Sequence, residues 1–197
     1  VTLPFKEQAY DLVGPRLSRR ARMAGAVYTL WLEEGQLHGC NTDGVGLVTD
    51  LQRLGLPLKD ARILMIGAGG AARGVIGPLL AEGCAHLRIV NRTPERAHAL
   101  IAAWPREHVP TPGSLSAGSL TQATSAQGWD LVLNASASSL SDAAPEVPSG
   151  LYAKGGCAYD LMYAAQPTAF MRQAQVDGAR QTHDGLGMLV EQAAESF

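Results

Sequence analysis

A glycine-rich segment carries the clearest chemistry in this sequence. The segment Gly67–Ala72 reads GAGGAA and matches the pattern G-x-G-x-x-G/A, between an apolar run and a segment of helical spacing. In this pattern the first glycine permits a tight turn and the second lets the backbone approach a pyrophosphate. The helix that follows presents free N–H groups to the phosphates. The pattern predicts a dinucleotide site, and the alternative is a tight turn that binds nothing. The residues expected to contact the cofactor are Gly67, Ala68, Gly69, Gly70 and Ala71.

The residues after the next apolar run indicate which dinucleotide binds. An NAD site usually places Asp or Glu at the end of the second strand, where it binds the ribose 2′-hydroxyl. Here that run ends in Asn91, Arg92 and Thr93, and Arg96 follows one turn later. A guanidinium can bind a 2′-phosphate through two hydrogen bonds, and near a helix start it is unfavourable unless an anion is bound. The sequence therefore favours NADP over NAD, the alternative being two solvated arginines.

Lys6 and Asp43 are candidates for the proton transfer that accompanies hydride transfer to or from an alcohol. Lys6 follows a strand-like run through a proline, a place from which a side chain can be aimed. Asp43 lies at the start of a predicted helix. The alternative to a catalytic role is that Lys6 is an ordinary surface lysine and that Asp43 only caps its helix.

The sequence lacks the motifs of a metal site and of a serine hydrolase. The five histidines have no metal-ligand spacing, and no G-x-S-x-G motif is present. The 16 basic and 18 acidic residues nearly cancel, which favours neither nucleic acid nor an anionic membrane as a partner. The three scattered cysteines are typical of a reducing compartment, so we expect a cytoplasmic protein. No apolar run approaches the roughly 20 residues that a membrane-spanning helix needs.

Strands and helices are predicted to alternate between Gly44 and Gly185. The expected strands are Arg62–Gly67, His86–Asn91, Trp129–Asn134 and Cys157–Leu161, and the expected helices are Ala71–Gly83, Pro94–Trp104 and Pro167–Gly178. This alternation predicts an α/β fold, with a doubly wound parallel sheet covered by helices on both faces, as in Rossmann-like domains. Between Pro105 and Gly128 we expect a loop with one weak strand and one weak helix.

The front of the chain predicts a smaller unit. The runs Ala26–Leu32 and Gln36–Cys40 flank a turn and predict a hairpin. Next, Asn41–Asp43 supplies the cap of a helix that ends at Gly55. The residues expected on the apolar side of this helix are Val45, Val48, Leu51 and Leu54. This portion is too short to bury a core alone, so we expect it to pack on missing residues or on the rest of the chain.

Eight motifs occur along the chain in a specific order. They are VTLPFK, AGAVYTL, GCNTDG, IGAGGAARGV, NRTPERA, DLVLNASASSL, YDLMY and DGLGMLVEQAAESF. Together they resemble the shikimate dehydrogenase family across essentially the whole chain. The resemblance implies NADP-dependent interconversion of shikimate and 3-dehydroshikimate, a step towards chorismate and the aromatic amino acids.

The resemblance also implies roles for individual residues. Lys6 corresponds to the catalytic lysine, which donates a proton in reduction and accepts one in oxidation. Asp43 corresponds to its partner, which orients the lysine and holds the substrate hydroxyl. The implied substrate contacts are Thr2, Tyr28, Tyr163 and Gln192. Leu161 and Gly185 join the glycine-rich segment and Asn91–Arg96 at the NADP site.

Two departures from the family pattern stand out. The family motif GAVNT has an asparagine that binds a substrate hydroxyl, and here that place is Tyr28. A phenol is larger and has no amide, which predicts an altered substrate fit. In NASASSL, Ser136 replaces the family's threonine and keeps the hydroxyl.

The family's layout predicts an internal fragment. VTLPFK lies inside the family's substrate domain, after a stretch that carries two serines for the substrate carboxylate, and this chain stops inside the last helix. The expected parts are a partial substrate-binding domain over 1–43, an NADP-binding domain over 44–185 and the start of a returning helix over 186–197.

Two alternatives stay open beside this interpretation. One is a relative that oxidises quinate or uses NAD, and the other is a nucleotide-binding fragment without catalysis. The expected partner is a small-molecule substrate, with neither nucleic acid nor membrane, and a homodimer is left open.

Overall fold

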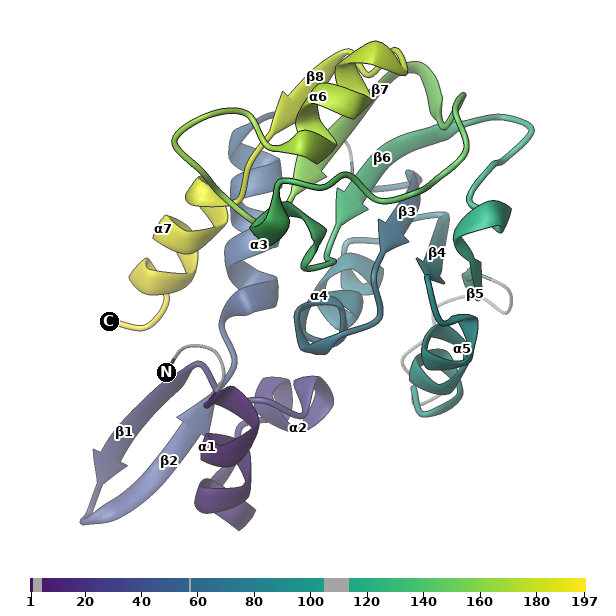
Figure 1. Ribbon diagram of the computed structural model, residues 1–197. Coiled ribbons are helices and arrows are strands. Elements are labelled where there is room, and N and C mark those ends of the chain that lie inside the picture. The colour runs from purple at the N-terminus through teal and green to yellow at the C-terminus, as the bar shows by residue number, and fades with distance from the viewer. Residues whose placement is uncertain (2–4, 57, 105–113) are drawn as a thin grey trace.

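A six-stranded sheet with helices on both faces forms the larger part of the structure (Figure 1). The computed structural model describes residues 1, 5–56, 58–104 and 114–197. The strands are β1 Thr29–Glu33, β2 Gln36–Cys40, β3 Arg62–Ile66, β4 His86–Asn91, β5 Leu115–Ser119, β6 Trp129–Asn134, β7 Tyr152–Asp160 and β8 Gln181–His183. The α-helices are α1 Lys6–Val13, α2 Arg19–Ala24, α3 Asp43–Arg53, α4 Gly70–Ala81, α5 Pro94–Ala102, α6 Ala169–Val176 and α7 Leu186–Ala194. Short 3-10 turns are η1 Gly14–Arg16, η3 Leu120–Gln122 and η4 Ser138–Ser141.

The order of the strands is that of a Rossmann-like domain. It runs β5-β4-β3-β6-β7-β8, and every neighbouring pair is parallel. The chain moves outward in one direction from β3 to β5 and in the other from β6 to β8. The loops after β3 and β6 therefore diverge and leave the crevice in which this class of sheet binds its ligand. The predicted doubly wound fold is confirmed.

The inner strands are largely apolar because both faces of the sheet are covered. Ile63 and Met65 of β3 belong to the cluster beneath α3, α4 and α5, whereas Leu64 and Ile66 belong to the cluster on the α6 side. All four side chains are buried. This two-sided burial explains the apolar run over residues 63–66 that predicted β3.

The front of the chain forms its own small layer. The hairpin of β1 and β2 is antiparallel and pairs Thr29 with Cys40 and Glu33 with Gln36. Helices α1 and α2 cover it over a cluster that contains Ala9, Val13, Leu17, Ala21 and Val27. The strand-like run ahead of Lys6 falls largely on residues 2–4, which lie outside the described residues.

Helix α3 connects this layer to the sheet and packs on two sides. Its buried face is centred on Leu47, whereas Val45, which we expected there, is only half-buried. The prediction was too narrow because α3 contacts both α4 and α7. Gly44 and Gly46 permit these contacts: a Cβ on Gly44 would overlap the backbone of α4, and one on Gly46 would lie 2.7 Å from the Cβ of Gln192.

Helix α7 runs back along α3 towards the hairpin (Figure 1). The hydroxyl of Ser196, just past its end, lies 2.7 Å from the Thr29 hydroxyl and 3.4 Å from that of Thr42. Arg20 and Glu195 form an ion pair of 2.5 Å beside them. The end of the chain is thus fastened to the front layer.

Candidate active site and nucleotide site

Lys6 and Asp43 form an ion pair between the first residues of two helices. The Nζ of Lys6, which begins α1, donates to both carboxylate oxygens of Asp43, which begins α3, at 3.0 Å each. The Lys6 side chain is 20% exposed and that of Asp43 is 5% exposed. A carboxylate is favourable at a helix start, whereas a lysine there is unfavourable. The ion pair with Asp43 compensates for the position of Lys6 at the start of α1. The structure therefore brings together the two residues that we expected to do the chemistry.

Asn41 supports the start of the helix that carries this carboxylate, and it was not among the predicted site residues. Its Oδ1 accepts the backbone N–H of Asp43 at 3.1 Å, and its Nδ2 donates to the carbonyl of Ala26 at 3.2 Å. Thr42 occupies the N-cap position without a side-chain capping bond. The signal for Asn41 was present, because asparagine before a helix start is typical of a cap.

The ring of Tyr28 covers the ammonium of Lys6. The Nζ lies 4.8 Å from the ring centroid, a distance at which a cation is attracted to an aromatic face. Tyr28 immediately precedes β1, and its carbonyl accepts the N-terminal ammonium of Val1 at 2.6 Å. An aromatic wall thus stands beside the lysine where the resemblance placed a substrate contact.

The other expected substrate residues lie on different elements. Gln192 of α7 is buried, and among the described residues its Oε1 has no hydrogen-bond partner. Its helix packs on α3 three residues from Asp43, through Gly46. Tyr163 lies in the loop after β7 and is 51% exposed. Thr2 lies outside the described residues.

The glycine-rich segment forms the tight turn between β3 and α4. Gly67 has a φ of +114°, and its N–H donates to the carbonyl of Val90 at 2.8 Å. A Cβ there would lie 2.8 Å from the Ala135 backbone, so only glycine fits. A Cβ added to Gly69 or Gly70 would meet open space, and α4 begins without a side-chain cap. Free N–H groups at an open helix start form an anion site.

Two arginines stand beside that turn, at the end of the neighbouring strand. Arg92 follows β4 and Arg96 lies in the first turn of α5, and both are exposed. In the described part of the chain, neither guanidinium has a hydrogen bond or an ion pair. Asn91 donates from Nδ2 to the carbonyl of Thr93 at 2.9 Å and shapes the turn. These side chains are free to bind a phosphate.

The remaining expected cofactor residues, Leu161 and Gly185, touch each other. The N–H of Leu161 donates to the carbonyl of Asn134 at 2.9 Å, and the N–H of Gly185 donates to that of Met162 at 2.9 Å. A Cβ on Gly185 would overlap the Leu161 carbonyl. Leu161 follows β7 and Gly185 follows β8, so both lie at the carboxyl ends of parallel strands, on the same edge of the sheet as the glycine turn.

A buried carboxylate that we did not predict holds the loops around these two residues. Asp160 is fully buried and accepts four hydrogen bonds. The donors are Ser139 Oγ at 2.6 Å, Thr168 Oγ1 at 2.7 Å, Asn134 Nδ2 at 3.1 Å and Met162 N at 3.1 Å. Ser136 donates to Asn134 at 2.6 Å and so joins this network. The network joins the loop after β6 to the loop after β7, which carries both Leu161 and Tyr163.

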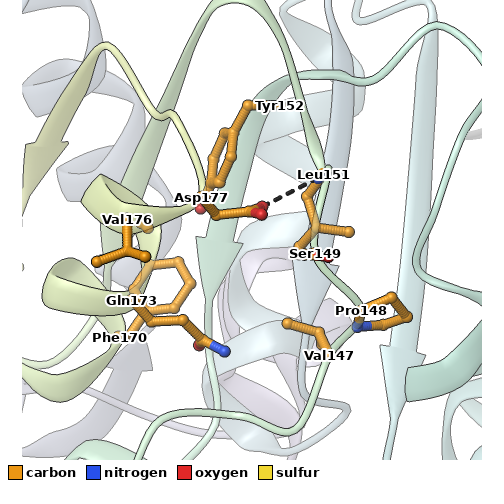
Figure 2. A pocket seen from close by; sticks show the side chains of 10 residues that line it. Val147, Pro148, Ser149, Leu151, Tyr152, Phe170, Gln173, Val176 and Asp177 are labelled. Atoms are coloured by element: carbon orange, nitrogen blue, oxygen red, sulfur yellow. Dashed lines mark hydrogen bonds between the residues drawn. The ribbon is translucent and has the colours of Figure 1, made fainter.

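A cavity of about 220 Å³ lies apart from all these residues, between α6 and the start of β7 (Figure 2). Its wall is mostly apolar and includes Val147 and Phe170. Asp177 accepts the N–H groups of Gly150 and Leu151 at 2.6 and 3.0 Å, which ties the end of α6 to this strand. Because β7 begins here, the cavity opens at the opposite edge of the sheet from the glycine turn. It contains none of the expected site residues.

Metal and membrane features are absent from the described residues. They contain no cluster of three His, Cys, Asp or Glu side chains that could hold a metal ion. They contain no helix long and apolar enough to cross a membrane. All three cysteines are free, and burial raises the pKa of the Cys84 thiol to about 11.

The parallel sheet and the open glycine turn define a Rossmann-like nucleotide-binding α/β protein, with an ion-paired lysine and aspartate beside the helix that follows the turn. A family model described as shikimate/quinate 5-dehydrogenase matches residues 50–138. The NADP-dependent shikimate dehydrogenase of Bordetella petrii is 62% identical over all 197 residues, which cover 69% of that protein.

Two solved structures extend the comparison. The shikimate 5-dehydrogenase of Thermus thermophilus, in complex with NADP(H) and shikimate, has a TM-score of 0.82 at 36% identity; the match covers 100% of this chain and 69% of that one. The 5-ketofructose reductase of Gluconobacter sp. strain CHM43 has a TM-score of 0.82 at 34% identity, over 99% of this chain and 69% of that one. The chain belongs to the shikimate dehydrogenase family, as the motifs predicted.

Proposed function

We propose that the chain provides the NADP site and the acid–base pair of an NADP-dependent shikimate dehydrogenase. The reaction is the reversible reduction of 3-dehydroshikimate to shikimate. The observation that carries the proposal is the ion pair of Lys6 and Asp43, which lies beside the nucleotide helix: a Cβ on Gly74 of α4 would be 3.5 Å from the Cβ of Asp43. The proposed substrate follows from family membership, and the proposed proton donor follows from this geometry.

The roles follow from the donors and acceptors of the pair. An ammonium has three N–H donors, and Asp43 uses two of those of Lys6, so one is available to a substrate oxygen. In reduction Lys6 gives a proton to the carbonyl oxygen, and in oxidation it accepts the hydroxyl proton. Asp43 orients Lys6 and holds a substrate hydroxyl. Tyr163, Gln192 and Thr2 are proposed to contact the substrate.

The nucleotide site suits NADP. The bound nicotinamide supplies the hydride. Gly67, Ala68, Gly69, Gly70 and Ala71 would hold the pyrophosphate at the start of α4, where the added-Cβ positions of Gly69 and Gly70 meet open space. Arg92 and Arg96 would hold the 2′-phosphate, with Asn91 and Thr93 shaping their turn. Leu161 and Gly185 would line the nicotinamide end of the crevice.

The proposal divides the chain into three parts. Residues 1–43 belong to the substrate-binding portion, 44–185 to the NADP-binding domain and 186–197 to a helix that returns to the substrate side. The contacts of Ser196 with Thr29 and Thr42 support the last assignment. We further propose a cytoplasmic location, in keeping with the free cysteines, and a homodimer stays open.

A second function in the same family is favoured by one residue. Tyr28 stands where the family's asparagine would bind a substrate hydroxyl, and its ring lies over Lys6. The 5-ketofructose reductase from Gluconobacter has the same fold. A related polyhydroxy ketone or alcohol, such as quinate, is therefore the alternative substrate.

Calorimetry and a turnover assay test the proposal together. NADP should bind the 197-residue chain at least tenfold more tightly than NAD, and Arg92→Ala should abolish the difference. Arg16→Ala, at an exposed arginine of the front layer, is the control and should change neither affinity. Shikimate oxidation is measured on the chain and on a hybrid completed with the outlying parts of the Bordetella petrii enzyme. If the hybrid binds NADP and oxidises quinate but not shikimate, the substrate of the proposed reaction is quinate instead. If it oxidises neither compound, the proposal is overturned.

A further inference from the structure

The position of Gln192 depends on how α7 is held. Among the described residues no side-chain bond fixes its Oε1, although the residue is only 6% exposed. Its backbone carbonyl accepts the Ser196 hydroxyl at 2.8 Å. Its Cβ packs on Gly46, with no room for a side chain between the helices. Contacts elsewhere on α7 must therefore determine where Gln192 points.

The first turn of α7 rests on a buried carboxylate of α3. Asp50 is 1% exposed, and a Cβ on Gly187 would overlap its carboxylate. Its Oδ2 accepts the hydroxyl of Tyr159 at 2.7 Å, and that hydroxyl oxygen accepts the N–H of Met188 at 3.3 Å. A hydrogen-bonded chain thus runs from the start of α7 through β7 to α3.

The other carboxylate oxygen has its own donor. Asp50 Oδ1 accepts Arg53 Nε at 3.0 Å and a terminal guanidinium nitrogen at 2.6 Å. The ion pair satisfies the buried charge, and the carboxylate stands near the positive end of the α7 dipole. Burial, reinforced by the hydrogen bond to Asp50, raises the pKa of Tyr159 well above its usual range. Its phenol therefore always has a proton to donate to Asp50.

We propose that Tyr159 and Asp50 are positioning residues of the reaction, which fix the first turn of α7 and thereby place Gln192 at the substrate. Gln192 lies five residues beyond Gly187, about 7.5 Å along the helix axis. A tilt of the first turn would move Gln192 and leave Lys6 and Asp43 in place. This inference rests on the proposed function.

Tyr159→Phe is the direct test, because it removes the hydroxyl and keeps the ring in the core. It should raise the KM for shikimate about tenfold or more, with the Kd of NADP changed less than threefold. The NADP affinity should largely persist because the proposed contacts to the phosphates, the glycine turn and the two arginines, lie away from α7, at the starts of α4 and α5. Only the nicotinamide end, where Gly185 caps α7, would be disturbed. In hydrogen exchange on the 197-residue chain, the amides of α7 should exchange at least tenfold faster.

Tyr152→Phe is the matched control. Tyr152 lies on the same strand at its opposite end, and burial raises the pKa of its phenol as well. This variant should leave both the KM and the exchange of α7 unchanged, even where it lowers the melting temperature. Gly187→Ala is the second variant, since its methyl group would push α7 off Asp50 without removing any hydrogen-bonding group. It should shift the KM in the same direction and serves where Tyr159→Phe does not fold.

The readouts separate this inference from the proposed function. Protection of α7 in Tyr159→Phe equal to that in the wild type overturns the inference, and so does an unchanged KM in an active enzyme. A wild-type hybrid that turns over no shikimate counts against the proposed function. In that case the exchange rates still decide whether Tyr159 holds α7.

Discussion

The ammonium of Lys6 lies 3.0 Å from each carboxylate oxygen of Asp43, although 37 positions separate the two residues in the chain. Each residue begins a helix, so the pair joins the front layer to the helix that leads to the sheet. The pair is largely buried, which strengthens its attraction and limits its screening by salt. In the proposed function, this pair supplies and orients the proton that the substrate oxygen exchanges.

Replacement of Lys6 tests this pair most directly. Lys6→Ala should lower the turnover number about 10²-fold or more, because the proton donor is lost, and should leave the Kd of NADP within twofold. The measurement is steady-state kinetics with shikimate and NADP, beside calorimetry. Lys59→Ala, at an exposed lysine ahead of β3, is the control and should keep full turnover. An unchanged turnover in Lys6→Ala would remove the lysine from the mechanism.

Replacement of Tyr28 tests the substrate fit. Tyr28→Asn restores an amide that can bond a substrate hydroxyl and removes the ring that lies 4.8 Å from Lys6. One additional hydrogen bond of about 1.4 kcal/mol corresponds to a tenfold lower KM for shikimate. Tyr28→Phe keeps the ring and should leave the KM near that of the wild type. A KM that rises in Tyr28→Asn would mean that the tyrosine itself recognises the substrate.

The sheet could be predicted because its signals are local. β4 and β6 span His86–Asn91 and Trp129–Asn134, the same bounds that the apolar runs gave. Each is a mostly apolar run with one charged residue near its start, Arg88 or Asp130, and each ends at an asparagine. The weak strand expected before Gly128 is β5, Leu115–Ser119, while residues 105–113 lie outside the described part.

Other elements escaped prediction for physical reasons. α1 and α2 are short, and their burial depends on contacts with the hairpin rather than on a strong period of their own. β8, Gln181–His183, is a polar edge strand of three residues with no apolar run. β7 begins at Tyr152, five residues before the expected start, because its first half includes Lys154 and two glycines.

The residues of the candidate site also fall into those that the sequence could predict and those that it could not. Lys6, Asp43 and the glycine turn belong to motifs that are contiguous in the chain, and so they could be named in advance. The partnership of Tyr159 with Asp50 spans 109 positions and could not. One signal for it existed, because Asp50 interrupts the apolar face of α3 next to Leu51. An acid in such a position needs buried donors, although the sequence does not say which.

Asp160 offers a test of the network beneath the two loops. Asp160→Asn places an amide group that donates where Ser139 and Thr168 already donate. The free energy of unfolding should fall by about 3 kcal/mol, because a buried donor is left without an acceptor. Denaturation in urea measures it. Asp142→Asn is the control: its side chain is 74% exposed and pairs with Arg172 at the surface, so the change should stay within about 0.5 kcal/mol. Equal losses in the two variants would show that the network contributes no more than a surface pair.

His86 should make the stability of the sheet depend on pH. Burial, and then the charge of Arg88, lowers the pKa of His86 in the folded chain below its ordinary value of about 6.5. The unfolded state therefore binds more protons between the folded-state pKa and pH 6.5, and stability falls as the pH drops through that window. Burial lowers the pKa of His183 too, so it contributes in the same direction.

The free energy of unfolding in urea, measured at pH 7.5 and pH 5.5, checks this dependence. His86→Gln keeps a partner for the Ser116 hydroxyl, which lies 2.8 Å from Nε2 of the histidine, and removes the titrating group. It should therefore lose less stability than the wild type between the two pH values. His98→Gln, at an exposed histidine of α5, should lose as much as the wild type. If His86→Gln and His98→Gln respond to pH alike, the buried histidine does not couple folding to proton binding.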